Sequence, residues 1–414
     1  MSKKLNILLV TYEFPPEMAT GGIGSYMNHL AHLLHASSHR VTVFSATTTH
    51  SDVYIVQREH CLNYLLPASE QETFREKVLT VFEAFIAENE VDVIESPEVG
   101  ACALEIKKAF PQIPLIVKMH TPGVLITKIS NSYQSLFTKL RFIIGALLRR
   151  RIDFGYWSRH DKNKKSDPEY LICEKADTLL SPSQALKKWA INFWQLPENK
   201  LKVLPNPFTA DEDLFAYPIE RHTKTICFIG KLTILKGMFT LTPAIKKILK
   251  EFPEYKFVLA GRDEPVSDSI PSMQKWMQKQ LKTIGDRVIF SGFLGREAVK
   301  KLLGSSEICV VPSLWENYPT VVLEAMAAGC TVAASKRGGI PEMIKHGGNG
   351  LLFNPENVPD IIFSIKKLIE SDVLRFKIAE EARLKVRSNN SVQDLIGIYE
   401  KDLKNLQRDI ITEY

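Results

Sequence analysis

The sequence lacks closely spaced cysteine pairs. Its six cysteines include no C-x-x-C motif, the spacing at which cysteines commonly bind zinc or act in redox chemistry. Four of the six lie in or beside apolar runs, where cysteine behaves as a small buried hydrophobic residue. We therefore expect neither a disulfide framework nor a zinc site, and free thiols are typical of a reducing compartment. The six are Cys61, Cys102, Cys173, Cys227, Cys309 and Cys330.

Long apolar runs are missing as well. Near the start, Lys3 and Lys4 precede only six largely apolar residues, 5–10, which is too short for the apolar region of a signal peptide. No uncharged apolar stretch approaches the roughly 20 residues that a helix needs to cross a bilayer. Together with the free cysteines, these absences predict a cytoplasmic protein.

The chain has no strong excess of charge of either sign. Lysine and arginine number 53 and aspartate and glutamate 47, so the net charge is +6. A mild basic excess suits small anionic substrates or an anionic membrane surface better than a polyanion such as DNA. No motif of the common nucleic-acid-binding folds is present, and we expect no nucleic-acid partner.

What is present is a regular alternation of strand-like and helix-like segments. At 414 residues and 45% hydrophobic content, the chain is long enough for two or three domains with sizeable cores. In the first half, short β-branched or leucine-rich runs alternate with amphipathic stretches, a rhythm typical of buried parallel sheets. The expected strands are 6–10, 40–45, 92–95, 115–119, 178–180 and 202–204, with helices at 25–36, 71–89 and 99–109.

The same alternation restarts after the polar stretch 209–224. We therefore expect an α/β fold with two Rossmann-like parallel-sheet domains, at 1–207 and 208–391. The last helical stretch, about 392–414, has no strand after it and is free to pack back on the first domain. The strands expected in the second domain are 225–230, 256–261, 287–292, 307–312 and 331–335.

One segment, 121–167, interrupts the alternation of the first domain. Its middle is apolar and is flanked by arginines, so residues 139–151 are predicted to form a basic helix. The simpler interpretation is a helix that covers the core or a cleft and keeps its charges in solvent. The alternative is an amphipathic basic helix that lies on a membrane, which would make the protein peripheral at the inner membrane surface.

The most informative stretch is 310–335. A strand is expected to end there, Pro319 suits the first position of the following helix, and Gly329 suits its C-terminal cap. Glu316 and Glu324 are eight residues apart, which along a helix is roughly 12 Å. The helix start lies between them, and its free N–H groups favour an anion. This pattern indicates a nucleotide sugar, with one carboxylate for sugar hydroxyls, amides for the diphosphate and the other carboxylate for the ribose diol.

A second stretch, 228–238, carries two cations next to the end of another strand. Gly230 opens a turn there, and Lys231 and Lys236 follow before Gly237 and a helix. The departure of a nucleotide diphosphate leaves negative charge on its β-phosphate, and preorganised positive groups stabilise that charge. The two lysines are therefore predicted to neutralise a departing diphosphate.

These two stretches together resemble family 4 of the retaining glycosyltransferases, which have the two-domain GT-B fold. Glu316 and Glu324 match the E-x7-E motif of that family, and Lys231 and Lys236 match its basic pair. The family usually has arginine at the first basic position and Gly-Phe-Gly after the first glutamate. Here lysine and the residues 317–319 stand there, and lysine keeps the charge without arginine's bidentate phosphate contact.

The resemblance covers nearly the whole chain and implies where the donor binds. Segment 260–265 takes the place of a family loop beside the nucleobase and sugar, 288–294 resembles the strand that reads the base edge, and 335–353 resembles a glycine-rich turn with its strand. The implied catalytic residues are His120, Lys231, Lys236 and Glu316. The implied donor-binding residues are Gly22, Gly230, Arg262, Phe293, Asn317, Tyr318, Pro319, Thr320 and Glu324.

The N-terminal half supplies the second wall of the implied cleft. Its glycine-rich loop 19–24 lets the backbone approach a ligand closely, without the full G-x-G-x-x-G dinucleotide pattern. In the family this loop approaches the donor phosphate and the acceptor, and Gly21 is assigned to the acceptor side. His120 stands at a strand's carboxyl end and matches a family histidine near the reacting sugar. Glu98, at another strand end, is a second acceptor-side candidate.

A short acidic run, Asp211-Glu212-Asp213, imitates the D-x-D metal motif of a different glycosyltransferase fold. It lies in the linker between the expected domains, outside the strand-end loops that carry that motif. We interpret it as a solvated acidic turn. We expect no metal ion and no other cofactor, because the nucleotide sugar is itself a substrate.

The residues and the resemblance together predict a metal-independent, retaining glycosyltransferase. Its donor is expected to be a nucleotide diphosphate hexose, with UDP-glucose or another UDP-hexose preferred, and its acceptor a glycan or lipid-linked glycan. One alternative is a nucleotide-sugar epimerase of the same fold, against which the E-x7-E motif argues. The other is a non-catalytic subunit of a polysaccharide assembly complex that docks through 139–151, against which the intact glutamate and lysine pairs argue.

Overall fold

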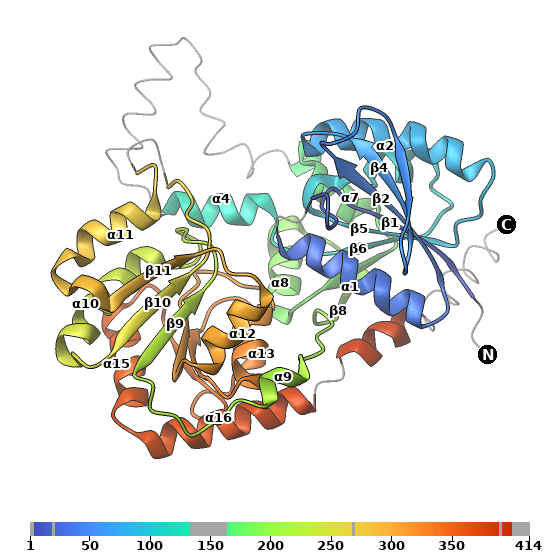
Figure 1. The fold of residues 1–414 in the computed structure, drawn as a ribbon. Coiled ribbons are helices and arrows are strands. Elements are labelled where there is room, and N and C mark those ends of the chain that lie inside the picture. Colours follow the sequence, from blue (N-terminus) through green and yellow to red (C-terminus); the bar gives the residue numbers. More distant parts are fainter. Residues whose placement is uncertain (1–3, 19–20, 133–163, 267–269, 389–390, 400–414) are drawn as a thin grey trace, which may run out of the picture. The chain divides into compact units, whose positions relative to one another are not determined.

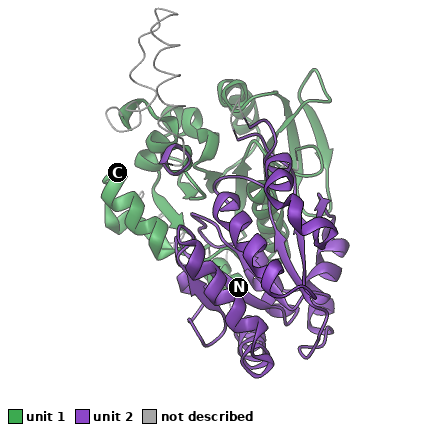
Figure 2. Cartoon of the chain, turned by 90° about the vertical axis from the view of Figure 1, so that its left-hand side faces the viewer, with its two compact units in different colours: residues 1–127, 134–207, 390–414 green, residues 128–133, 208–389 purple. Residues whose placement is uncertain are grey.

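The structure, a computed structural model, describes residues 4–18, 21–132, 164–266, 270–388 and 391–399. The predicted basic helix at 139–151 lies outside these residues. The chain forms two compact units, each built on one sheet (Figure 2). The first unit contains the described parts of 1–127, 134–207 and 390–414, and the second unit those of 128–133 and 208–389.

The sheet of the first unit has eight strands among the described residues, in the order β3-β4-β2-β1-β5-β6-β7-β8 (Figure 1). Every neighbouring pair is parallel except β3 with β4. Every residue of the inner strands β5, β6 and β7 is buried, as expected for parallel strands that are covered on both faces of the sheet. The strands are β1 (Asn6–Val10), β2 (Arg40–Thr47), β3 (Tyr54–Gln57), β4 (Leu62–Pro67), β5 (Val93–Pro97), β6 (Leu115–Lys118), β7 (Thr178–Ser181) and β8 (Leu201–Val203).

Helices link these strands because parallel neighbours need a crossover connection. In the first of them, Tyr26, Met27, Leu30 and Leu34 are buried at spacings of one turn, so one helix face packs against the sheet. The helices of this part are α1 (Gly22–Ala36), α2 (Gln71–Ile86), α3 (Leu104–Ala109), α4 (Gly123–Ser132), α7 (Pro168–Lys175) and α8 (Gln184–Trp189), with short turns η1 (Val99–Ala101), η2 (Lys164–Ser166), η3 (Ala190–Trp194) and η4 (Glu198–Lys200).

Residues 391–399 form a helix that belongs to the first unit. Leu395 and Tyr399 have no exposed surface and lie in the same apolar cluster as Leu9 and Met27. The first unit thus includes a segment that follows the second unit in the sequence.

The second unit has a sheet of six parallel strands among its described residues, in the order β11-β10-β9-β12-β13-β14. The strands are β9 (Thr225–Ile229), β10 (Lys256–Ala260), β11 (Val288–Gly292), β12 (Ile308–Val311), β13 (Thr331–Ser335) and β14 (Leu351–Phe353). The helices are α9 (Glu212–Phe215), α10 (Met238–Glu251), α11 (Met273–Leu281), α12 (Arg296–Gly304), α13 (Thr320–Ala327), α14 (Ile340–Met343), α15 (Val358–Ile369) and α16 (Asp372–Arg387), with the turn η5 (Lys282–Arg287).

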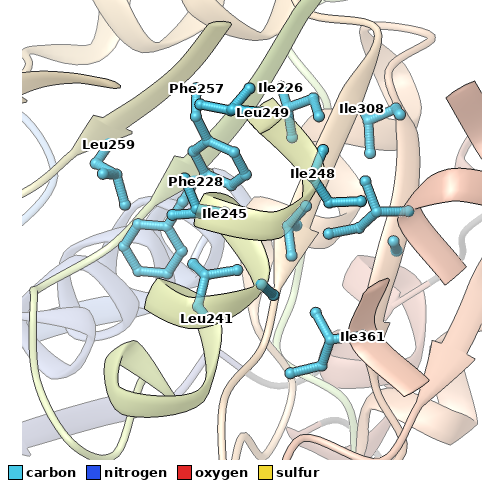
Figure 3. Packing of buried hydrophobic residues seen from close by; sticks show 14 of the residues in the cluster. Ile226, Phe228, Leu241, Ile245, Ile248, Leu249, Phe257, Leu259, Ile308 and Ile361 are labelled. Atoms are coloured by element: carbon cyan, nitrogen blue, oxygen red, sulfur yellow. The ribbon is translucent and has the colours of Figure 1, made fainter. Parts of the chain in front are cut away.

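The larger core of the second unit forms where α10 packs on the sheet (Figure 3). Leu241, Ile245 and Ile248 recur along α10 at helical spacing and are fully buried. They meet side chains such as Phe228 of β9 and Phe257 of β10. The 3.6-residue period of the helix and the two-residue period of the strands therefore point the same apolar set inward.

The structure differs from the sequence prediction at a few elements. Strands β3 and β4 were not predicted, and β3 shows no inward-facing pattern because Tyr54 and Ile55 are both about half exposed at the sheet edge. The helix expected at 99–109 is divided into η1 and α3, since Gly100 and Ala101 adopt positive φ angles of 77° and 49°.

In both units the strand order reverses beside the unit's first strand. Strand β1 lies between β2 and β5, and β9 lies between β10 and β12. In open parallel sheets, ligands bind outside the carboxyl ends of the strands at such a reversal. The loops that follow β1, β5, β9 and β12 are therefore where a functional site is expected.

No helix in the described part of the chain is long and apolar enough to cross a membrane.

The core predicts a sharp difference between two phenylalanines of the second unit. Phe228→Ala removes a side chain with 1% exposure and should lower the free energy of unfolding by about 3–5 kcal/mol. Phe363, on α15, is 65% exposed, so Phe363→Ala should change it by less than about 0.5 kcal/mol. Urea unfolding of both variants checks this, and similar losses would contradict the packing.

Candidate active site

Three glycines form the carboxyl edge of the second sheet. Gly230 follows β9, Gly261 follows β10, and Gly292 ends β11. The Gly261 N–H donates to the Gly292 carbonyl at 2.7 Å, and a Cβ on Gly261 would overlap the Gly230 carbonyl oxygen. Since only glycine tolerates so close an approach, these backbones lie against one another without intervening side chains.

The turn after β9 is held against the loop after β12. Gly237 has a φ of 77°, and a Cβ there would overlap the Pro312 carbonyl oxygen. Next to it, the Leu314 N–H donates to the Leu235 carbonyl at 2.8 Å. This contact brings together two predicted residues, because Lys236 precedes Gly237 and its ammonium pairs with the Glu316 carboxylate.

Glu316 is fixed by further hydrogen bonds. The Ser313 hydroxyl donates to Glu316 Oε1 at 2.9 Å, and the Gly339 N–H donates to the Glu316 carbonyl at 2.7 Å. A Cβ on Gly338, which has a φ of 62°, would overlap that same carbonyl. The glycine-rich turn recognised in the sequence therefore supports the backbone of Glu316.

Helix α13 starts immediately after this loop. Thr320 is its first residue and Pro319 its N-cap, one position later than the sequence predicted for the helix start, a shift within the usual uncertainty of helix ends. In the first turn, the Val322 N–H donates to the Pro319 carbonyl at 3.1 Å, whereas the N–H groups of Thr320 and Val321 come before the first acceptor that the helix itself provides. At the other end, Gly329 and Cys330 donate to the carbonyls of Met326 and Ala325 at 3.0 and 2.9 Å, a Schellman cap around a glycine with positive φ, as predicted for Gly329.

Glu324 lies along α13 and is partly buried. Burial raises the pKa of its carboxyl above the ordinary value, and the Arg296 guanidinium partly offsets this effect. The raised pKa means that the surroundings of Glu324 favour the neutral carboxyl over the carboxylate more than water does.

Lys231 pairs with a carboxylate that was not predicted. Its Nζ lies 3.6 Å from Glu264 Oε1, and its side chain is 50% exposed. The adjacent Leu232 N–H donates to the Arg262 carbonyl at 2.9 Å. The Arg262 guanidinium in turn lies 4.9 Å from the centre of the Phe293 ring, which is 68% exposed. Both residues predicted beside the nucleobase thus contact each other.

The loop residues that depart from the family pattern have structural contacts. The Trp315 indole N–H donates to Asn317 Oδ1 at 2.7 Å, and Asn317 is buried. Tyr318 is partly buried among the residues of α13 and β12, and burial raises the pKa of its hydroxyl. These contacts hold the loop between Glu316 and Pro319 in place.

The acidic linker run is solvated at Glu212 and Asp213, as predicted, whereas Asp211 is partly buried and the run begins helix α9 in place of a turn. Asp211 caps α9 by accepting from the Asp213 N–H at 3.4 Å. Lys300 donates to Asp211 Oδ2 at 2.8 Å and to Asp213 Oδ2 at 3.1 Å. Asp211 Oδ2 also lies 3.7 Å from Arg296 Nε, so these carboxylates contact basic side chains of α12.

In the first unit, His120 and Glu98 lie together at the carboxyl ends of β6 and β5. The His120 N–H donates to both oxygens of Glu98 at 2.7 Å. The Glu98 side chain has no exposed surface. Glu98, predicted on the acceptor side, thus contacts the backbone of another predicted site residue.

The sequence did not predict the buried cluster of Tyr26, Glu95 and Lys118 beside His120. The Tyr26 hydroxyl donates to Glu95 at 2.7 Å, and the Tyr26 ring packs edge-on against His120 at 5.5 Å. Lys118 donates to the Leu204 carbonyl at 2.6 Å and lies 5.4 Å from the centre of the Tyr26 ring. Burial raises the pKa of Glu95 and lowers that of Lys118, each to about 7.

A second carboxyl, the partly buried Glu169, holds the loop after His120. Its Oε2 accepts from the Gly123 N–H at 2.7 Å. Burial, and then the charge of Glu98, raise the pKa of Glu169 to about 8. Nothing in the local sequence indicates this contact, because Glu169 is 46 residues from Gly123.

The predicted glycine loop reaches the start of α1. Gly21 is the N-cap of the helix and Gly22 its first residue. A Cβ on Gly21 would lie 3.1 Å from a Glu13 carboxylate oxygen, whereas a Cβ on Gly22 would have no neighbour within 4 Å. A side chain at position 22 would therefore enter open space at the start of the helix.

Two family models match consecutive parts of the chain. The model described as Glycosyltransferase Family 4 matches residues 20–212, and the model described as Glycosyl transferases group 1 matches residues 209–385. Between them they include every predicted site residue. The chain belongs to the group 1 glycosyltransferases of family 4.

This glycosyltransferase also resembles curated relatives. An uncharacterized glycosyltransferase of Methanocaldococcus jannaschii is 29% identical over 258 residues, 58% of this chain and 64% of that protein. A lipopolysaccharide 1,2-N-acetylglucosaminetransferase of Salmonella typhimurium is 29% identical over 240 residues, 55% of this chain and 62% of that protein. The matched segments thus span less than two thirds of either relative.

Solved structures share the fold of this glycosyltransferase at lower identity. A sucrose-phosphate synthase from Thermosynechococcus elongatus has a TM-score of 0.74 and 19% identity, with 97% of this chain and 100% of that chain covered. HepE from Anabaena, solved with UDP-glucose, has a TM-score of 0.62 and 18% identity, with 99% of both chains covered. These likenesses confirm the predicted GT-B fold with two parallel-sheet units.

Two glycines of this glycosyltransferase allow a test of the Gly237 contact. Gly237→Ala must both adopt a positive φ and displace the Pro312 carbonyl, so the unfolding free energy should fall by clearly more than the roughly 1–2 kcal/mol cost of a left-handed residue. Gly347 has nearly the same φ, 76°, with nothing within 4 Å of its Cβ position, so Gly347→Ala should show that cost alone. Urea unfolding measures both, and equal losses would argue against the contact.

The raised pKa of Glu169 predicts a change in the pH dependence of stability. An acid whose pKa rises from 4.5 to about 8 on folding stabilises the fold at low pH, and this contribution is lost as the pH rises through 8. Glu169→Gln stays neutral, so its melting temperature relative to the wild type should increase between pH 6 and pH 9. Glu83→Gln, at an exposed position of α2, serves as the control, and a constant difference for Glu169→Gln would contradict the assignment.

Proposed function

We propose that this chain transfers a hexose from a nucleotide diphosphate sugar to a glycan or lipid-linked glycan, with retention of configuration and without a metal ion. UDP-glucose or another UDP-hexose is the preferred donor. The observation that carries the proposal is the cluster of Lys236, Glu316 and the start of α13 at the carboxyl edge of the second sheet. Membership of a glycosyltransferase family independently supports transfer from a nucleotide sugar.

We assign the donor diphosphate to the start of α13 and the two lysines. The first N–H groups of the helix, from Thr320 onward, favour an anion. Lys236 and Lys231 each already contact a carboxylate. In the proposal, a phosphate binds beside each ammonium and shares it with the carboxylate that already contacts it.

The hydroxyl groups of the donor are assigned to the two glutamates of the E-x7-E motif. Glu316 is held by Ser313 and Lys236 and keeps acceptor capacity for hydroxyls of the transferred sugar. Glu324 is assigned to the ribose diol, since hydroxyl donors would satisfy a carboxyl that burial otherwise disfavours as an ion. In the first unit, His120 is assigned to the transferred sugar and the Gly21–Gly22 loop to the phosphate and acceptor.

The nucleobase is assigned to the exposed edge beside Phe293 and Arg262. The aromatic ring and the planar guanidinium already contact each other, and both group types commonly stack on bases. The preference for uridine rests on family relatives, since HepE of the same fold was solved with UDP-glucose.

In the proposed reaction, the bond between the anomeric carbon and the β-phosphate oxygen breaks. The acceptor hydroxyl oxygen bonds to the same face of the sugar, and its proton passes to the departing phosphate oxygen. Lys231 and Lys236 stabilise the charge that develops on this leaving group. Attack on the same face retains the configuration and needs no enzyme nucleophile on the opposite face.

Substitution of the central pair tests the proposal. Lys236→Ala and Glu316→Gln should each lower kcat by about 10²–10³-fold, the usual effect of removing one preorganised transition-state contact. Lys256, exposed at the amino end of β10, provides the control, and Lys256→Ala should leave kcat within about twofold because it lies at the opposite edge of the sheet. A thermal-shift screen of a panel of nucleotide sugars first identifies the donor. Sugar transfer and UDP release are then measured with that donor for each variant.

Other outcomes would favour other functions. Near-normal rates in Lys236→Ala and Glu316→Gln with unchanged circular dichroism would contradict the site. Isomerisation of the nucleotide sugar in the absence of any acceptor would indicate an epimerase. Binding of UDP with no turnover on any acceptor would indicate a non-catalytic subunit.

A further inference from the structure

The His120 loop is held by the buried carboxyl group of Glu98 and the partly buried carboxyl group of Glu169, from distant parts of the first unit. Glu98, after β5, takes the His120 N–H on both oxygens, and Glu169, from α7, takes the Gly123 N–H. Burying a carboxyl group is costly unless it is hydrogen-bonded. Here both groups are satisfied by backbone N–H groups of one loop, so the loop and the two acids fix one another.

The ring of His120 is oriented as well as its backbone. Its Nδ1 lies 3.0 Å from the Lys118 carbonyl oxygen and 3.4 Å from Glu98 Oε2. A carbonyl oxygen can only accept, so Nδ1 must carry the proton to make this hydrogen bond. In the neutral imidazole, Nε2 is then the acceptor nitrogen.

Neighbouring groups restrict the remaining freedom of the ring. Tyr26 packs edge-on against it, with an angle of 76° between the ring planes, and the hydroxyl of Tyr26 is itself held by Glu95. His120 is 13% exposed. Rotation of the ring about its side chain would therefore break the Nδ1 hydrogen bond and the contact with Tyr26.

We propose that Glu98 is a positioning residue that, together with the Lys118 carbonyl, holds the tautomer and direction of His120, so that Nε2 accepts a hydrogen bond from a hydroxyl of the transferred sugar. This inference rests on the proposed function, which assigns His120 to that sugar. It replaces the direct acceptor contact predicted for Glu98, because the fully buried carboxylate acts through His120. Glu169 supports the same loop from its other end.

The Glu98→Gln variant tests this role. Glutamine keeps the shape but replaces one acceptor oxygen with an amino group, so the His120 backbone and ring lose part of their support. We expect kcat to fall by about 10–10²-fold, as misplacement of a catalytic contact does. The donor KM should change by less than about threefold, because the diphosphate and ribose contacts belong to the second unit. Glu83→Gln, at an exposed carboxylate on α2 of the same unit, should leave both constants unchanged.

A spectroscopic readout separates positioning from stability. In protein labelled with ¹⁵N-histidine, the His120 signals, assigned by their loss in His120→Gln, should show the Nδ1–H tautomer in the wild type and a shift or mixture in Glu98→Gln. His120→Gln should also retain about tenfold more kcat than His120→Asn, since the glutamine oxygen can take the place of Nε2. Both measurements use the full chain.

The outcomes are distinct. An Nε2–H tautomer in the wild type, an unchanged kcat in Glu98→Gln, or equal activities of the two His120 variants would overturn the proposal. A Glu98→Gln chain that fails to fold would assign Glu98 to stability and overturn it too. If the wild type transfers no sugar while the tautomer still responds to Glu98→Gln, the proposed function fails and the geometry of His120 stands.

Discussion

Two close backbone approaches in the second unit decide where its charged side chains lie. Gly237 lies against the Pro312 carbonyl, and Gly338 lies against the carbonyl of Glu316. A side chain at either glycine would push the neighbouring segment away. Because the approach is so close, Lys236 and Glu316, which are 80 residues apart in the chain, form one ion pair. The start of α13 follows from the same loop, so cation, carboxylate and helix terminus are set by backbone geometry.

The first unit fixes its site by different means. Its carboxyl edge holds buried ionisable groups in place of closely packed glycines. Glu98 and Glu169 accept backbone N–H groups of the loop that carries His120, and Glu95 and Tyr26 form a hydrogen bond below it. Removing one partner from such a group leaves a buried polar atom unsatisfied, which costs about 1–3 kcal/mol or more. Other arrangements of these side chains would leave such atoms unsatisfied, so the hydrogen bonds favour one arrangement of this edge.

Much of the fold was predictable from local sequence. Continuous apolar runs marked the inner strands, and the pair Pro319 and Gly329 marked the ends of α13 to within one residue. Strand β3 was not predictable, because a short edge strand with both faces partly in solvent has no alternating pattern. The partners of Glu95 and Lys118 were not predictable either. Glu95 is in the middle of β5 and Lys118 is the last residue of β6, and both strands are fully buried; nothing in the flanking residues indicates which partner satisfies either side chain.

The sequence by itself determined the repeating strand–helix order, the family motifs, and the residue types available at each strand end, because these depend on neighbours along the chain. Tertiary structure alone decided the pairings. It joined Lys236 to Glu316, Lys231 to Glu264 and the His120 backbone to Glu98. Such pairs are set by which strands become neighbours in a parallel sheet and by how closely their loops approach. Spacing along the chain carries little information about either.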